Sequence, residues 1–132
     1  MRLNCVKSDH NAAKVLALMI ALDLNAELMF QDETTGSLQH RLSLEDGAPQ
    51  SEPLYDVNTI LRFLARQFKD KGYAGILPKE EAQIDQWLAY CSSTLDPLVA
   101  SIYQTYNDPE AGSSDALVNK LKALSLELNI LQ

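Results

Sequence analysis

The sequence contains little cysteine and little histidine, with two residues of each among 132. Cys5 and Cys91 are far apart and form no CxxC pair, and the two histidines do not cluster with them. Disulfide-stabilised secreted domains and zinc sites need several such residues at short spacing. The composition therefore argues against both classes, and we expect neither a metal site nor a bound cofactor.

Positive charge and long apolar runs are also scarce. Eleven Lys and Arg against eighteen Asp and Glu give a formal net charge of −7, too acidic for a surface that neutralises nucleic-acid phosphates. The longest apolar run, residues 15–22, is much shorter than the roughly 20 residues of a bilayer span, and its polar flanks do not fit a signal peptide. We therefore expect a cytoplasmic protein with no membrane segment and no direct contact with nucleic acid.

The remaining composition is that of a folded domain, with 46% hydrophobic and 22% charged residues. A chain of this length forms one domain or two small subdomains. Residues 1–70 mix strand-like and helical patterns, whereas residues 71–132 are helical apart from one loop. The sequence thus predicts an α+β protein with subdomains at 1–70 and 71–132.

Hydrophobic periodicity places the elements of the first half. Alternation with period two predicts strands, and apolar residues at i, i+3, i+4 and i+7 predict helices. Alternating residues predict strands at 1–7 and 40–44, the short run ELMFQ at 27–31 is interpreted as a further strand, and helical spacing predicts helices at 9–22 and 56–69. A strand, helix, strand order followed by a strand, a turn and a helix is the outline of a thioredoxin-like subdomain.

The second half follows a glycine-containing linker at residues 71–77. Helical spacing predicts one long helix over residues 78–106, bent at Pro97, and a last helix from residue 114 or 115. Trp87 shares a face with apolar neighbours, which predicts a place in the core.

Two segments of the first half resemble motifs of the glutathione transferases. Residues 39–47 match the scaffold positions of V-P-x-L-x-x-x-x-G, and residues 54–64 match those of L-x-E-S-x-x-I-x-x-Y-L. The positions that contact glutathione differ: His40 stands where the family has a cis-proline, and Val57 replaces the serine that follows the acidic residue, here Asp56. The resemblance implies a glutathione-transferase-like fold with a reduced thioredoxin-like half, and the differences predict no saturable glutathione binding at low-millimolar ligand.

The second half narrows this resemblance. Residues 86–90 (QWLAY) and 95–98 (LDPL) are similar to patterns in the glutathione-transferase-like domains of aminoacyl-tRNA synthetases. The opening residues 1–3 (MRL), and a loop expected at residues 32–37 in place of a second helix, most closely resemble the N-terminal domains of eukaryotic methionyl-tRNA synthetases. Elongation-factor subunits show related patterns. Such domains continue beyond the position of Gln132, so the helical half is expected to be a truncated version.

The resemblance implies a non-enzymatic interaction module that assembles translation components. Its expected partners are glutathione-transferase-like domains of synthetase-complex or elongation-factor proteins. Pairing in the manner of transferase dimers makes Arg62, Arg66, Tyr90 and Ser93 the candidate partner-binding residues. Arg62 and Arg66 are expected on the outer face of their helix, and solvent-facing helix charges remain an alternative explanation for both. Apolar residues close to the end of the chain favour a homodimer, namely Leu124, Leu126, Leu128, Ile130 and Leu131.

A second hypothesis is a reduced glutathione transferase. Ser8 lies near the position of the hydroxyl that activates the glutathione thiol in serine-type transferases, although a serine before a helix is more often an N-cap. Cys5 and Cys91 are expected to be buried small hydrophobes rather than nucleophiles. The main interpretation therefore assigns no catalytic residue, and the alternative assigns Ser8.

Overall fold

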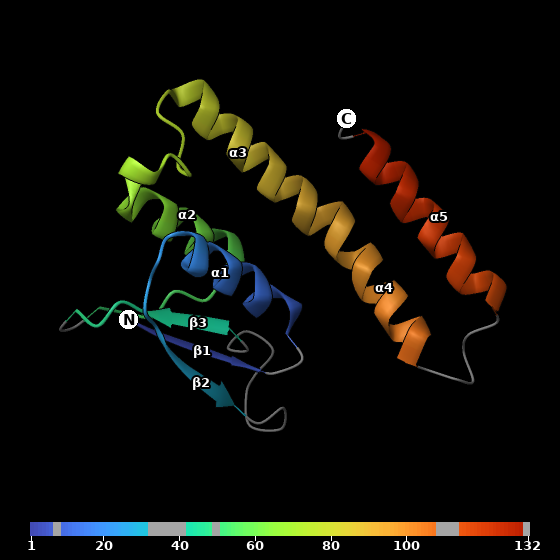
Figure 1. Cartoon of the computed structure of the whole chain (residues 1–132), viewed down its shortest axis with the longest axis horizontal. Coiled ribbons are helices and arrows are strands. Elements are labelled where there is room, and N and C mark those ends of the chain that lie inside the picture. Colours follow the sequence, from blue (N-terminus) through green and yellow to red (C-terminus); the bar gives the residue numbers. More distant parts are fainter. Residues whose placement is uncertain (7–8, 32–41, 49–50, 108–113, 131–132) are drawn as a thin grey trace. The chain divides into compact units, whose positions relative to one another are not determined.

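The computed structural model describes residues 1–6, 9–31, 42–48, 51–107 and 114–130 (Figure 1). The chain divides into two compact units, Met1–Glu81 and Ala82–Gln132. The first unit thus continues past the linker at which the sequence suggested a boundary, because side chains of the preceding helix hold the linker and the first turn of the next helix. Each unit is described separately.

The first unit is built on a three-stranded sheet of β1 (Arg2–Val6), β2 (Glu27–Gln31) and β3 (Leu42–Glu45) in the order β2-β1-β3. β1 pairs parallel to β2 and antiparallel to β3, with Cys5 opposite Leu42 in the second pair. Leu54 adds one antiparallel bridge to Leu44. The strands match the predicted segments, and residues 40–41 of the third lie outside the described residues.

Two helices cover one face of this sheet (Figure 1). Asp9 caps α1 (His10–Ala21) and Asp56 caps α2 (Val57–Gln67), each by accepting a hydrogen bond from a backbone N–H of the first turn. Alternate residues of β1 and β3 meet the apolar faces of both helices. The buried residues that form this core are Leu3, Cys5, Ala12, Val15, Met19, Leu22, Leu42, Leu44, Ile60 and Leu64.

Polar pairs occupy the opposite face of the sheet. Arg2 lies 3.0 Å from Glu27 and 3.6 Å from Glu45 across neighbouring strands. Asn4 donates to Ser43 and to Glu45. The strict alternation of apolar and polar residues fixes the register, since a slip by one residue would bury these groups against α1 and α2.

α1 is followed by Asp23 in the left-handed region (φ 58°). The Leu24 N–H donates to the Met19 carbonyl and the Asp23 N–H to the Ile20 carbonyl, and these bonds close the end of the helix. One local prediction in this unit is wrong. Arg62 was expected on the outer face of its helix, but it is only 9% exposed, because the linker folds over it.

The second unit consists of helices. It contains most of α3 (Pro78–Tyr90), then a π-helical segment (Cys91–Leu95), α4 (Asp96–Asn107) and α5 (Ser114–Ile130). The predicted bend at Pro97 takes the form of this wider segment. Pro97 has no N–H to donate to the carbonyl four residues earlier, and a π-helical turn relieves the mismatch.

Side chains rather than a buried core connect the helices of this unit. Lys120 on α5 donates to the Ser101 carbonyl at 3.2 Å and to Thr105 Oγ1 at 2.5 Å on α4. Among the described residues of 82–130, none is fully buried, and Trp87 is 51% exposed, so its predicted place in the core is wrong. No helix in the described ranges has the length and hydropathy of a bilayer span.

Candidate functional site

The topology brings four chain segments to one edge of the sheet. β1 ends at Val6 where β3 begins at Leu42, because the two strands are antiparallel. Leu54 runs antiparallel to β3, so the chain moves toward this same edge as it reaches Asp56 and enters α2. α1 also begins here, since it follows β1 and returns the chain to the parallel strand β2. We call this edge, with the first turns of α1 and α2, the β1-exit edge.

The start of α2 places a carboxylate and a hydroxyl side by side at this edge. Asp56 Oδ2 accepts from the Thr59 N–H at 2.8 Å and from Thr59 Oγ1 at 3.0 Å. Both contacts are exposed to solvent, so the pair is open to a ligand. Comparison with the family motif at position 57 alone did not identify Thr59 as a hydroxyl at this site. The spacing Asp-x-x-Thr at the start of a helix is the sequence signal that would have identified it.

The start of α1 presents a different set of groups. Asp9 Oδ1 accepts from the Asn11 N–H at 2.9 Å. The side-chain oxygen Oδ1 of Asn11 is buried and has no hydrogen-bond partner in the described parts of the chain. A buried acceptor left unpaired costs about 1–3 kcal/mol, so a donor from a ligand would be favourable there.

Cys5, next to this edge, is not a candidate nucleophile. Its side chain is 1% exposed, and burial, together with the nearby Asp9 carboxylate, raises the pKa of the thiol. A thiol with a raised pKa stays protonated and unreactive at neutral pH. Cys91 is half-buried in the helical unit, and both cysteines are free.

The two residues that decide between the hypotheses lie outside the described residues. Ser8 lies in the sequence between Val6, the last residue of β1, and Asp9, the N-cap of α1. His40 precedes β3 by two residues. Every peptide bond in the described ranges is trans.

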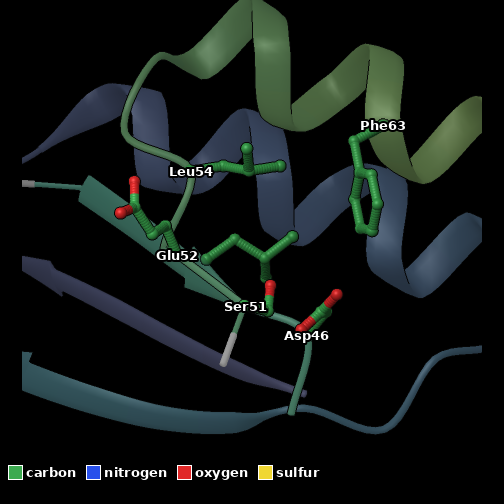
Figure 2. A pocket seen from close by; sticks show the side chains of 6 residues that line it. Asp46, Ser51, Glu52, Leu54 and Phe63 are labelled. Carbon is green, nitrogen blue, oxygen red and sulfur yellow. The ribbon is translucent and has the colours of Figure 1, made fainter. Parts of the chain in front are cut away.

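A small pocket of about 80 Å³ lies at the opposite edge, beyond the end of β3. Its walls are Leu44, Asp46, Ser51, Glu52, Leu54 and Phe63, and in Figure 2 the Phe63 ring hangs from α2 toward Asp46. The Ala48 N–H and the Ser51 hydroxyl hold the pKa of Asp46 below its usual value. These partners are local turn contacts, and the pocket is separated from the β1-exit edge by the length of the sheet.

The candidate partner-binding residues fall into two pairs. Arg62 and Arg66 both approach Glu81 Oε2, at 3.6 and 3.3 Å, and Arg62 also donates to the Ala74 carbonyl at 3.2 Å. Arg62 is thus a buried brace of the linker, while Arg66 is exposed. In the second unit, Tyr90 donates to Glu127 Oε2 at 2.5 Å.

The second pair, Tyr90 and Ser93, lies close together because Tyr90 ends α3 and Ser93 is in the π-helical segment that follows it. The Ser93 hydroxyl donates to the Tyr90 carbonyl at 3.4 Å, and the Trp87 ring meets the Tyr90 ring edge-on at 5.9 Å. The hydrogen bond to Glu127 raises the pKa of Tyr90. In the described part of the chain, His, Cys, Asp and Glu form no group that could hold a metal ion.

Neither a protein-family model nor a curated protein matches the chain. Solved structures do match it. The theta-class glutathione S-transferase of Xanthomonas axonopodis pv. citri, with glutathione bound, has a TM-score of 0.77 and 19% identity over 96% of this chain. Poplar glutathione transferase F1 has a TM-score of 0.76 and 19% identity over 98% of the chain. A possible glutathione S-transferase of Rhodopseudomonas palustris has a TM-score of 0.74 and 22% identity over 98% of the chain.

The chain spans 63%, 66% and 63% of the lengths of these three structures. The similarity shows the fold and confirms the predicted α+β, glutathione-transferase-like architecture. None of these three is a synthetase domain, so the comparisons give no support to the synthetase branch. The expectation that the chain is not an enzyme is wrong by the same comparison, because the proteins sharing its fold are named as transferases. That expectation placed too much weight on His40 and Val57 relative to the retained topology.

Proposed function

We propose that the chain acts in a glutathione-dependent transferase, with the β1-exit edge as the glutathione site and Ser8 as the residue that activates the thiol. The observation behind this proposal is the meeting of the end of β1, the start of β3 and the start of α2 at one edge. Transferases of this fold, including one with glutathione bound, support it.

The contacts to glutathione would come from groups already at the edge. The Asp56 carboxylate accepts hydrogen bonds from an ammonium group such as that of the γ-glutamyl end, and Thr59 supplies a hydroxyl in place of the one lost at Val57. Helix N-termini favour the carboxylates of the tripeptide. Because the usual serine is absent, we expect binding in the millimolar range.

The chemical step requires little from the protein. The glutathione thiol releases its proton to water, and the Ser8 hydroxyl donates a hydrogen bond to the resulting thiolate. The thiolate sulfur attacks the carbon of an activated aryl halide, a carbon–sulfur bond forms, and the halide leaves with the electron pair of the broken bond. A hydrogen bond to a charged group stabilises it by about 1.5–3 kcal/mol, which lowers the thiol pKa.

The test compares aryl-halide conjugation by the wild-type chain, Ser8→Ala and Ser92→Ala, the last being the same change in the helical unit. We expect Ser8→Ala to lower kcat/KM about ten- to hundredfold while Ser92→Ala leaves it unchanged. Equal activity in all three proteins would remove Ser8 from the mechanism. A wild-type rate no faster than the uncatalysed reaction would overturn the proposed function itself.

Association with another glutathione-transferase-like domain is a second, compatible proposal. It rests on the helical unit, whose described residues include exposed aromatic side chains, Trp87, Tyr103 and Tyr106, and no buried core. This second proposal includes partners from synthetase or elongation-factor complexes and a cytoplasmic location. Equilibrium sedimentation of the chain alone tests self-association, and a monomer at all micromolar concentrations would contradict the homodimer.

A further inference from the structure

An exposed surface between α2 and α3 combines basic and apolar side chains. It consists of Lys69, Lys71, Tyr73, Ile76, Leu77 and Lys79, and we call it the linker surface. Five of the eleven Lys and Arg residues of the chain lie between positions 62 and 79, where Asp70 is the one acidic residue. Arg62 is buried and Arg66 pairs with Glu81, so the unpaired positive charge at the surface of this segment comes from its three lysines, on a protein whose net charge is −7.

The side chains of the linker surface are open to solvent. Ile76 is 83% exposed, Leu77 58% and Tyr73 46%. Lys69, Lys71 and Lys79 are exposed, and their side chains make no hydrogen bond or ion pair within the described residues. Exposed apolar side chains close in sequence to unpaired lysines are a typical feature of a binding surface.

The backbone beneath these side chains is fixed. Arg62 holds the Ala74 carbonyl from below. The Glu80 carboxylate accepts from the Ile76 N–H at 2.7 Å and from the Leu77 N–H at 3.0 Å. The loop is thus presented in one conformation, so binding loses little conformational entropy.

We propose that the linker surface binds the surface of an anionic lipid bilayer, with Tyr73, Ile76 and Leu77 entering the headgroup region and the lysines pairing with lipid phosphates and carboxylates. Apolar side chains beside several lysines fit an interfacial site. Six residues are too few for a standard protein interface, which uses about 20–30 residues a side. The occupied N–H groups of Ile76 and Leu77 also exclude strand addition there.

The test is co-sedimentation of the full chain with vesicles of equal parts phosphatidylcholine and phosphatidylserine, and with phosphatidylcholine alone. We expect binding to the anionic vesicles that weakens as salt is added, and little binding to the neutral ones. Ile76→Asp/Leu77→Asp should abolish it. The matched control, Ile20→Asp/Met29→Asp, changes two exposed apolar side chains of α1 and β2, outside the linker surface, and should bind like the wild type.

A second comparison isolates the charge. Each Lys→Gln change at positions 69, 71 or 79 should weaken vesicle binding about fivefold, whereas Lys122→Gln should leave it unchanged. Equal effects at all four positions would overturn the proposal. So would binding to soluble polyglutamate without binding to vesicles, which would indicate an acidic protein partner. Conjugating activity should stay the same in these variants, so the outcome is independent of the proposed transferase function.

Discussion

Gly75 is the single residue that determines how closely the linker approaches α3. Its φ of 77° is in the left-handed region, and a Cβ built there would lie 3.0 Å from Glu80 Cβ and 3.0 Å from the Glu81 backbone nitrogen. Gly47 has a similar φ of 85° but open space where a Cβ would point. The two glycines therefore separate backbone strain from steric overlap.

Gly75→Ala should lower the free energy of unfolding by about 2–4 kcal/mol, through left-handed strain plus overpacking against backbone that cannot move aside. Gly47→Ala should cost only the strain, about 1–2 kcal/mol. Urea denaturation of both variants measures the difference. Equal losses would show that the contact with α3 does not constrain the linker.

Arg62 and Arg66 form a second matched pair, since both reach Glu81 from α2. Arg62→Met leaves the buried Ala74 carbonyl without its donor and should cost about 1–3 kcal/mol. Arg66→Met removes an exposed ion pair and should cost at most about 1 kcal/mol. Chemical denaturation of the two variants compares them, and a larger loss in Arg66→Met would contradict the bracing role of Arg62.

These residues also show where single-residue prediction from sequence fails. Helical spacing placed Arg62 on the outside of α2 because periodicity reports only the face toward the main core. The linker covers a second face, and that contact depends on residues twelve positions away. The prediction that Trp87 is in the core was wrong for the opposite reason. Its apolar neighbours on α3 share its face of the helix, but that face is not buried.

At the scale of elements, Glu80 connects the linker to the start of α3. The N–H groups of Leu77 and Ile76 donate to its carboxylate and lower its pKa from the ordinary 4.5. The folded-state pKa is thus below the unfolded one. Ionised Glu80 stabilises the fold above the unfolded pKa, and this contribution is lost as the pH falls through the folded pKa.

Glu80→Gln should therefore reduce stability most near neutral pH. We expect the difference in free energy of unfolding between wild type and Glu80→Gln to be largest above about pH 6 and to shrink as the pH falls below the ordinary Glu value. Other carboxylates titrate in both proteins and cancel in the comparison. A difference that stays constant or grows in acid would contradict the capping role.

Strands and helices with strong local patterns were predictable from the sequence. β1 alternates polar and apolar residues, α1 and α2 begin at an aspartate cap, and Pro78 with Glu80 marks the start of α3. The π-helical segment before Pro97 was not predictable from the sequence, since a proline in a helical pattern indicates a disturbance of the helix without specifying its geometry. Thr59 was likewise missed because its role depends on the capped geometry of Asp56.

At the scale of the whole molecule, the two units differ in burial. The first unit has a buried core from both sheet and helices, while the described residues of the second include none that is fully buried. Backbone hydrogen bonds near solvent open more readily than those in a core. The units should therefore differ in local stability.

Hydrogen–deuterium exchange measures this difference directly. Peptides from β1 and from the middle of α2 should exchange slowly, and peptides from residues 84–106 should exchange faster under the same conditions. Equal protection throughout would mean that the helical unit is as well packed as the first unit.

The topology of the first unit followed from element order, because a strand, helix, strand start and a later antiparallel strand have few compact arrangements. The function did not follow from the sequence. The substitutions at His40 and Val57 predict a loss of glutathione contacts, whereas Asp56 with Thr59 retains a carboxylate and a hydroxyl. Sequence motifs report single positions, whereas a binding edge is assembled from several segments.

Glutathione titration monitored by NMR backbone amide shifts tests the central claim most directly. We predict saturable shifts at millimolar glutathione that are confined to the β1-exit edge, at the amides of Asn11, Leu42 and Thr59. Phe63 and Ser51, at the pocket on the opposite edge, should not move. Shifts centred on that pocket, or none up to the solubility of the ligand, would contradict the account.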